Sequence, residues 1–311
     1  MSAVFRVAAP LAKRERMVAA NRSRQAPASS ESTSGLPAPL LSSRHRKWDG
    51  IVVELHNFRS VDVIVPVREH VIGVHVAGSV NLLQSRNGRT SVRHVRAGDV
   101  TITPSGEPKR FQHTGENIVI LLKLAPAFLQ RVAGDECAID PSRFELRENF
   151  GTPDPQLVAM GKQILAALEP EGAVGRIHVE SLTVQLAKHL LSRYGTASIS
   201  PQKTAPQLSQ RKLQRALEYI DNNLREDISL ADVAQTLAMS PGHFAHAFRQ
   251  STGLPPHRFV LARRIELAKS LLRETDLPIT EIAHRIGCAS HSHFSVLFHR
   301  TTGQTPRDYR N

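Results

Sequence analysis

Between residues 51 and 124, short runs of β-branched and other apolar residues alternate with polar turn sequences. Such runs predict strands, which we place at 51–55, 60–65, 71–76, 80–83, 91–95, 100–103 and 118–122. Asn87-Gly88, Gly98-Asp99 and Ser105-Gly106 mark turns between them. Seven short strands with no long helical pattern between them predict a small antiparallel barrel or jelly roll.

Beyond residue 126 the apolar residues recur at helical spacing. This spacing predicts helices at 127–132, 155–168 and 175–193, the last two joined as a hairpin. The apolar stripes of the hairpin are expected to pack on the barrel, on each other or on a second subunit. Residues 196–207 are small, polar and interrupted by proline, which predicts a linker.

The last hundred residues contain one aromatic pattern twice. Phe244, Phe248, Gly253, Pro256 and Phe259 return at an offset of fifty as Phe294, Phe298, Gly303, Pro306 and Tyr309. After a helix at 208–224, each copy predicts two short helices joined by a turn, with Ser229, Ser240, Thr280 and Ser290 as N-caps. A helix at 258–274, about 25 Å long, is expected to hold the copies roughly one DNA turn, about 34 Å, apart.

The buried aromatic positions determine which side chains of each second helix face outward. In the first copy these are Gly242, Ala245, His246 and Arg249. In the second copy they are His291, Ser292, Ser295, Val296 and His299. The start of the second helix of a helix-turn-helix enters the major groove, so we predict that these residues contact DNA. No carboxylate or cysteine accompanies the histidines, and no metal site is predicted.

This repeat resembles the AraC/XylS family of bacterial transcription regulators over residues 208–309. The resemblance is carried by Ile279-Thr280-Glu281-Ile282-Ala283, Gly287, Ser290, His293-Phe294-Ser295, Phe298, Gly303, Thr305-Pro306, Tyr309 and Arg310. Cys288 stands where the family usually has Phe, and Ala238 where a turn Gly is common. The resemblance implies a regulator that binds double-stranded DNA, works with RNA polymerase, more often activates than represses, and lies in the bacterial cytoplasm at the nucleoid.

The charge of the chain is concentrated at its two ends. The formal net charge is +12, of which residues 1–48 carry +7, residues 49–205 carry +1 and residues 206–311 carry +4. A basic C-terminal unit suits DNA, because phosphate neutralisation releases counterions. The Ser-, Pro- and Arg-rich residues 1–49 predict a disordered basic tail. The two cysteines, Cys137 and Cys288, cannot make a disulfide framework and suggest a reducing compartment, and no apolar run is long enough to cross a membrane.

The segment from Gly98 to Gly106, with Pro104 inside it, resembles the second conserved motif of cupins. A metal cupin would also offer a His-x-His with a Glu, and His70 and His75 are too far apart for that. By resemblance to AraC-type regulators, the barrel is expected to bind an unknown small-molecule effector and the hairpin to form a homodimer. The polar or aromatic residues proposed for the pocket are Trp48, His70, His75, Arg110 and His113.

The sequence therefore predicts an α+β chain of two domains. It has a tail at 1–49, a cupin-like effector-binding and dimerisation domain at 50–195, a linker at 196–207 and an all-α double helix-turn-helix domain at 208–311. No catalytic residue, cofactor or metal is predicted, and the chain is not expected to be an enzyme. Two alternatives stay open, a barrel that binds another protein and a cupin-type enzyme with an appended DNA-binding domain. The sequence leaves open the effector, the operon and the direction of regulation.

Overall fold

The computed structural model describes residues 36–310 apart from 87, 138, 140–143, 169–174, 197–206 and 289. Leu36–Asn311 form one compact unit. Most of the predicted tail and almost all of the predicted linker lie outside the described residues. The remainder of the tail region is ordered, because β1 (Leu41–Ser42) pairs with the strand that follows it. The expectation of disorder through residue 49 is therefore wrong for residues 36–49.

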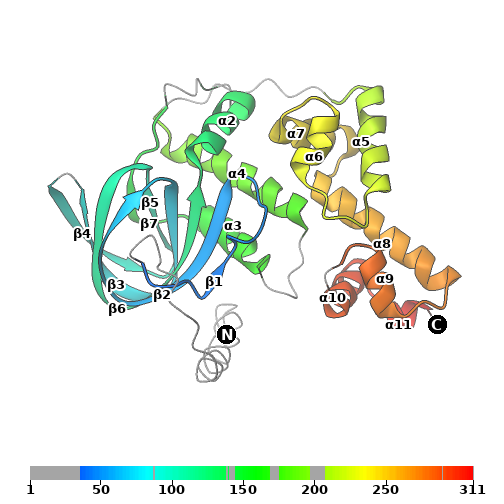
Figure 1. Ribbon diagram of the computed structural model, residues 1–311, viewed down its shortest axis with the longest axis horizontal. Coiled ribbons are helices and arrows are strands. Elements are labelled where there is room, and N and C mark those ends of the chain that lie inside the picture. Colours follow the sequence, from blue (N-terminus) through cyan, green and yellow to red (C-terminus); the bar gives the residue numbers. More distant parts are fainter. Residues whose placement is uncertain are drawn as a thin grey trace. The chain divides into compact units, whose positions relative to one another are not determined.

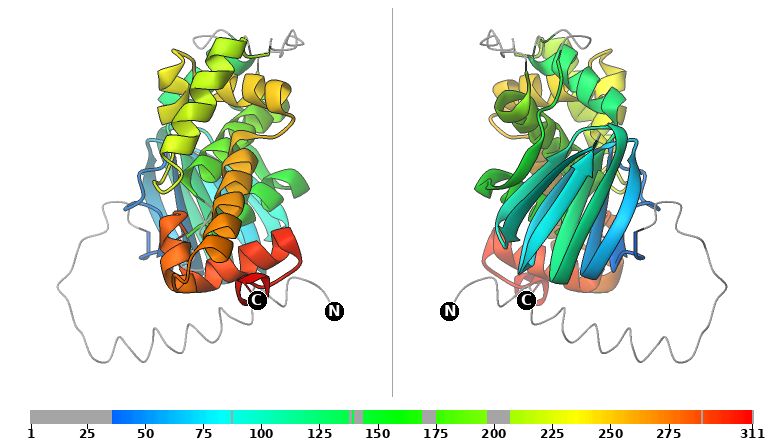
Figure 2. Two further views of the ribbon diagram at one scale, coloured as in Figure 1. Left: turned by 90° about the vertical axis from the view of Figure 1, so that its right-hand side faces the viewer. Right: turned by 90° about the vertical axis from the view of Figure 1, so that its left-hand side faces the viewer.

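The N-terminal part is an antiparallel sheet whose strands are longer than the sequence predicted (Figures 1 and 2). They are β2 (Ile51–Val67), β3 (His70–Arg86), β4 (Arg89–Arg96), β5 (Asp99–Thr103), β6 (Gly106–Leu124) and β7 (Asn149–Pro153). The gaps between the predicted strands, at 56–59 within β2 and at 77–79 within β3, are irregularities in the ladder, with register shifts between Phe58 and Ser60 and between His75 and Ala77. A bulge keeps a strand paired through a short polar segment that interrupts the apolar pattern of the sequence.

Hydrogen-bonded strands follow the order β1-β2-β6-β3-β5-β7, and β4 pairs with β3. The path is open at both ends, so the described strands form a curved sheet and not the closed barrel that was predicted. One face of this sheet is apolar and fully buried, with residues such as Val74, Ile102 and Leu122. Helix α3 (Pro155–Ala166) packs on it, and Gly161 of α3 lies against Val74 and Leu122.

Three helices accompany the sheet: α2 (Pro126–Cys137) lies between β6 and β7 in the chain, and α3 and α4 (Arg176–Tyr194) follow β7. Helices α3 and α4 contact each other, as expected of the hairpin, and α4 also contacts α2 and the C-terminal helices α6, α7 and α8. The predicted apolar stripe of α4, including Leu182, Leu186 and Leu190, is buried within the chain. Of the three packing partners considered for the hairpin, the described structure therefore provides the sheet and the neighbouring helices.

The C-terminal part is all helical (Figure 1). Its helices are α5 (Gln210–Asn222), α6 (Leu230–Thr236), α7 (Pro241–Thr252), α8 (Pro256–Glu274), α9 (Ile279–Arg285), α10 (His291–Thr302) and α11 (Pro306–Arg310). Two apolar clusters form, one around Phe244 and Phe248 and one around Phe294 and Phe298. Helix α8 contributes to both, with Val260 in the first and Ile265 in the second. The architecture is thus α+β, with an antiparallel sheet first and a double helix-turn-helix after it.

Candidate DNA-binding site

The repeated aromatic pattern forms the same three-ring stack in both copies. The rings of Phe244 and Phe248 lie 5.3 Å apart, and Phe259 meets Phe248 edge-on at 5.3 Å. In the second copy Phe294 and Phe298 lie 5.5 Å apart, and Tyr309 meets Phe298 edge-on at 5.3 Å. The four phenylalanines of the pairs are completely buried. These residues therefore fix the second helix of each copy against its core and do not reach DNA.

The ends of the two second helices are also alike. Ser240 Oγ accepts the backbone N–H of His243 at 3.3 Å, and Ser290 Oγ accepts that of His293 at 3.2 Å. These N-caps confirm the predicted helix starts. At the other ends Gly253 and Gly303 adopt left-handed backbone with φ of 77° and 80°, which suits a glycine helix terminator. We call α7 the first reading helix and α10 the second.

Two predicted caps have different outcomes. Ser229 caps α6 and forms a capping box, because its backbone N–H is in turn accepted by Asp232. Thr280 is not a cap. Helix α9 begins at Ile279, two residues before the predicted start, and its N-cap position is Pro278, which makes no side-chain hydrogen bond to the helix. The proline already fixes a backbone angle suitable for helix entry, so no hydroxyl is needed there.

The two copies have different residues at one equivalent position in the turn between their helices. Ala238 in the first copy has φ of 49°, and Gly287 in the second has φ of 73°. A Cβ on Gly287 would lie 2.9 Å from the carbonyl oxygen of Arg225 and 2.9 Å from Nη2 of Arg264. Ala238 is exposed. The first turn therefore has room for a methyl group, and the second does not.

The predicted outward residues of the second reading helix are accessible. His291, Ser292, Val296 and His299 are exposed, with Val296 at 68%, and Ser295 is half-buried. An exposed valine among polar residues on one helix face suits contact with a thymine methyl group, as hydroxyl and imidazole groups suit base edges. Cys288, just before this helix, is half-buried, and burial raises the pKa of its thiol to about 11.

The N-terminal part of the first reading helix is covered by other helices, whereas the same part of the second is exposed to solvent. Gly242 is buried, Ala245 and His246 are half-buried, and only Arg249 of its predicted outward residues is exposed. A narrow gap beside Gly242 is lined by Phe128 and Val132 of α2, among other residues. The prediction that Gly242 is exposed is wrong for this structure, because helices α2 and α4 pack over the start of α7.

The helices that cover the first reading helix also change the pKa of His246. Burial lowers its pKa, and the positive charges of Lys188, on α4, and Arg249 add to the effect. Burial and these neighbouring charges therefore both favour the neutral form of the imidazole. A neutral imidazole is both donor and acceptor, whereas the protonated ring is a donor only.

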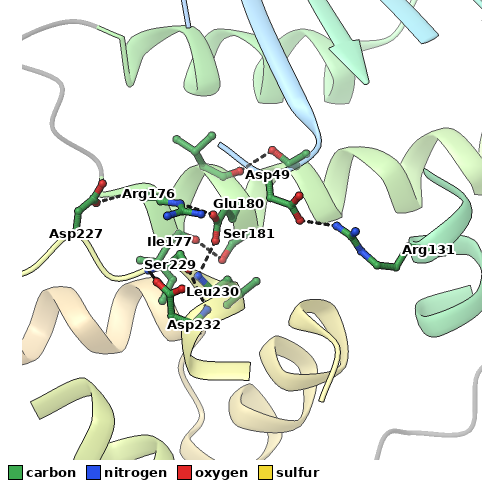
Figure 3. Close-up of polar contacts among 12 residues, drawn as sticks. Asp49, Arg131, Arg176, Ile177, Glu180, Ser181, Asp227, Ser229, Leu230 and Asp232 are labelled. Carbon is green, nitrogen blue, oxygen red and sulfur yellow. Dashed lines mark hydrogen bonds and ion pairs between the residues drawn. The ribbon is translucent and has the colours of Figure 1, made fainter. Parts of the chain in front are cut away.

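Helix α4 is attached to the C-terminal helices by specific contacts (Figure 3). Glu180 Oε2 accepts the backbone N–H of Leu230 at 2.6 Å, and its other oxygen accepts Nε of Arg176 at 2.7 Å. The backbone N–H of Arg176 donates to Asp227 at 3.1 Å. Ile177 is buried in the apolar cluster of the first copy. The carboxylate of Glu180 thus occupies the start of α6, where orphan backbone N–H groups favour an anion.

A histidine pair also joins α4 to α8. The rings of His178 and His257 meet edge-on with their centroids 4.4 Å apart. Burial lowers the pKa of both rings to about 4, and the positive charge of Arg258 contributes to each. Both rings are therefore neutral at neutral pH.

The residues proposed for the effector pocket do not form one group. His75 and His113 are buried, and the His113 ring lies edge-on to Phe58. His75 Nδ1 is hydrogen-bonded to Asn117 Oδ1 at 3.1 Å, whereas its Nε2 and the Nδ1 of His113 have no hydrogen-bond partner among the residues that the structure describes. These two histidines are the part of the prediction that the structure places in a common buried region.

The other three candidates lie elsewhere. His70 is half-buried and its Nδ1 accepts the backbone N–H of Ser105 at 3.1 Å. Arg110 is exposed and makes a two-pronged ion pair with Asp62. Trp48 is half-buried and lies beside Arg131 of α2 and Arg176 of α4, away from the sheet interior.

A buried ionic group on β2 and β6 is not among the residues predicted from the sequence. Glu54 accepts Nζ of Lys123 at 2.6 Å and Nε of Arg44 at 2.7 Å, and is hydrogen-bonded to Nε2 of His56 at 3.2 Å. Burial opposes ionisation of Glu54, but these hydrogen bonds outweigh it and hold its pKa below the usual range. The available signal was the alternation of Glu54, His56 and Phe58 on a strand with apolar residues at every other position.

Among the described residues, no group of three or more His, Cys, Asp or Glu side chains is placed to hold a metal ion. Within the same residues, no helix is long and apolar enough to cross a membrane.

Comparison with known proteins agrees with this geometry. Residues 233–311 match a family model described as a helix-turn-helix domain. The HTH-type transcriptional activator RhaS of Salmonella dublin is 26% identical over 264 residues, which is 82% of this chain and 86% of the relative. An uncharacterized HTH-type transcriptional regulator of Staphylococcus aureus (strain COL) is 25% identical over 241 residues, 77% of this chain. The chain spans only 31% of the length of that relative.

Among solved structures, the C-terminal domain of AraT, a response regulator from Geobacillus stearothermophilus, is 35% identical in sequence. The match covers 33% of this chain and 85% of that one, with a TM-score of 0.32. The duplicated helix-turn-helix and the family model that matches residues 233–311 define a helix-turn-helix DNA-binding domain at the C-terminal end of the chain. The chain belongs to the AraC/XylS family.

Proposed function

We propose that this chain binds a specific DNA sequence through both reading helices and regulates transcription in response to a small molecule. The proposal rests above all on the matched geometry of α7 and α10, two helices with the same caps and ring stacks carried on one helix, α8. A duplicated recognition unit on one rigid element suits two successive major grooves. Activation, through contact with RNA polymerase, is the direction we favour.

The second reading helix is proposed to supply most of the base contacts. Its outward histidine, serine and valine side chains are accessible. Neither reading helix has an arginine at the centre of its outward face, where it could make a bidentate contact with guanine. We therefore expect a recognition site that is read by single hydrogen bonds and by methyl contacts.

Gel mobility shifts test this function. The full chain should bind DNA flanking its own coding region more tightly than unrelated DNA, and His291→Ala should reduce the specific affinity about tenfold, as the loss of one base contact would. His94→Ala removes an exposed histidine from β4 and serves as the matched control. Equal affinity of the wild type for both DNAs, or equal effects of the two variants, would contradict the assignment.

For the sheet domain, residues 50–195, we propose a sensory role. The buried region that contains His75 and His113 supports it, because unpaired ring nitrogens can hydrogen-bond to a polar ligand. A thermal-shift screen of metabolites tests this. Stabilisation by a metabolite that His113→Leu abolishes supports the role, and the absence of any stabilising metabolite contradicts it.

A homodimer is a further proposal. The leucines of α4 are buried within the chain, so a dimer contact has to use other surfaces, and light scattering of the full chain measures the mass directly. The alternative of a protein-binding sheet domain is separated from the sensory role by calorimetry with candidate effectors. Metal analysis of the purified chain tests the cupin-type enzyme alternative.

A further inference from the structure

Besides sharing α8, the two copies of the helix-turn-helix meet at a loop of the first copy. Among the described residues, helices α5, α6 and α7 make no extensive contact with α9, α10 and α11, whereas both groups pack on α8 (Figure 1). The loop between α5 and α6, residues 223–229, lies against Gly287 in the turn between α9 and α10. We call residues 223–229 the junction loop. It gives the two copies a second connection beside α8.

The junction loop and the turn of the second copy are in close backbone contact. A Cβ on Gly287 would lie 2.9 Å from the carbonyl oxygen of Arg225 and 3.0 Å from that of Leu224. Gly287 has a left-handed backbone with φ of 73°, which glycine adopts without steric cost. The second reading helix begins soon after it, at His291. The position of Gly287 against the loop therefore influences where that helix lies.

Arg264 of α8 is hydrogen-bonded to both the junction loop and this turn. Its Nε donates to the carbonyl oxygen of Leu224 at 2.9 Å, and its Nη2 donates to that of Glu226 at 2.6 Å. Its Nη1 donates to the carbonyl oxygen of Gly287 at 3.3 Å. The side chain is buried. Each nitrogen of the guanidinium group thus meets a backbone carbonyl, two from the first copy and one from the second.

The guanidinium group restricts how the copies can move relative to each other. It is planar, and its N–H donors point in fixed directions, so three carbonyl groups that accept from it at once must keep their relative positions. A buried charge that loses its hydrogen bonds is costly. One shared helix would let the copies tilt, because long helices bend gently. The contacts of Arg264 oppose that tilt.

We propose that Arg264 is a positioning residue for DNA recognition, which fixes the angle between α7 and α10 and thereby the spacing of the two half-sites that the chain binds at once. One base pair more between two half-sites turns one relative to the other by about 35°, so a fixed angle admits one spacing. The recognition part of this inference rests on the DNA-binding function proposed above. The structural part, the fixed angle between the helices, does not.

Distances between spin labels on the two reading helices test the structural part. Gln250 and Arg300 are exposed and occupy equivalent positions in the two copies, so each is replaced by cysteine in a full chain whose Cys137 and Cys288 are replaced by alanine. We expect one narrow distance distribution in this parent chain and a broader or shifted one after Arg264→Met. Arg264→Lys keeps the charge but not the fork of donors, and its distribution should lie between the two.

A matched control separates positioning from stability. Ile220→Ala removes a buried side chain from the apolar cluster of the first copy. It should destabilise the chain substantially while leaving the three carbonyl contacts in place, so its distance distribution should stay as narrow as that of the parent chain. A distribution that Arg264→Met leaves unchanged, or Arg264→Lys if the first variant does not fold, would overturn the inference. Equal broadening by Ile220→Ala would do the same.

Gel mobility shifts with altered spacing test the recognition part. They use Glu180→Ala, which lacks the carboxylate that accepts the Leu230 N–H, with and without the Arg264 substitution used for the distances. The duplex is selected by Glu180→Ala from random-sequence DNA, and hydroxyl-radical footprinting locates its half-sites. Two base pairs inserted between the half-sites should lower the affinity of Glu180→Ala at least about tenfold, and that of the double variant less.

Each outcome of the shift experiment bears on one part of the inference. Protection of a single groove by Glu180→Ala, no loss of its affinity on insertion, or equal losses for both proteins would overturn the spacing role. A chain that gives the expected label distances but binds no specific DNA contradicts the proposed function and leaves the structural part supported. A chain that binds specific DNA but whose label distances do not depend on Arg264 contradicts the inference alone.

Discussion

The first and second reading helices have the same scaffold and different surroundings. Each starts at a serine cap, carries a buried phenylalanine pair and ends at a left-handed glycine. The second presents His291, Ser292 and Val296 to solvent, whereas the start of the first, at Gly242, is buried beneath α2 and α4. Duplication of the fold has therefore produced two helices of equal construction and unequal access. We propose on this basis that the sheet domain influences DNA binding through the first copy.

The largest effect on stability is expected at Arg264, the residue of α8 that links the two helix-turn-helix copies. Arg264 of α8 is buried and donates to the carbonyl oxygens of Leu224 at 2.9 Å, Glu226 at 2.6 Å and Gly287 at 3.3 Å. Arg264→Met keeps the bulk and leaves three carbonyl groups without that donor. We expect a loss of about 4 kcal/mol in the free energy of unfolding, measured by denaturant titration. Arg263→Met, at an exposed position beside it, is the control and should cost under about 1 kcal/mol.

The two turns should respond in opposite ways to exchange of their residues. Gly287→Ala places a methyl group against Arg225 and Arg264 at positive φ, and we expect it to cost about 3 kcal/mol. Ala238→Gly relieves positive φ at an exposed position and adds chain entropy to the unfolded state, so the net change should be within about 0.5 kcal/mol. Equal effects in denaturant titrations would mean that the second turn is not packed as described.

The junction between α4 and α8 should weaken in acid. The pKa of His178 and that of His257 are lowered to about 4 in the folded chain, below the ordinary value of about 6.5. Stability from this pair is therefore complete above pH 6.5 and falls as the pH falls toward 4. With half discounted for solvent screening, we expect a loss of about 2 kcal/mol between pH 7 and pH 5.

Unfolding free energies of the wild type and of the double variant His178→Leu and His257→Leu measure this term. The double variant should lose less stability on acidification. Parallel pH profiles for the two proteins would contradict the role of the pair.

Release of the first reading helix should follow from loss of one carboxylate. Glu180→Ala removes the acceptor of the Leu230 N–H, and we expect it to raise the affinity for specific DNA about tenfold, since hydrogen bonds to a charged group are of that size. Glu266→Ala removes the same charge from an exposed position on α8 and controls for the change in net charge. An equal gain in both variants would assign the effect to charge alone.

Local features of the DNA-binding domain could be predicted from the sequence because their causes are local. Ser240 and Ser290 cap helices that begin at the next residue, and the phenylalanines recur at the spacing of one helix face. Gly242 is buried because α2, more than a hundred residues earlier in the chain, packs beside it. The sequence of α7 alone therefore could not predict this burial.

The strands of the sheet domain and the partners of their side chains were harder to predict from the sequence, for a similar reason. Strand β2 continues past Phe58 because β6 pairs with it through a register shift, and a shift between two strands is not visible in either one alone. Arg110 looked available for a ligand, but its charge is matched by Asp62, 48 residues away. Partners of this kind are determined by the register of the sheet.

Hydroxyl-radical footprinting on a site selected from random-sequence DNA tests the central claim most directly, with the wild type and Glu180→Ala compared on the same fragment. The unequal access of α7 and α10 predicts that the wild type protects mainly the backbone around one major groove. The variant should protect two successive grooves about 34 Å apart. Equal protection of both grooves by the wild type would contradict the account.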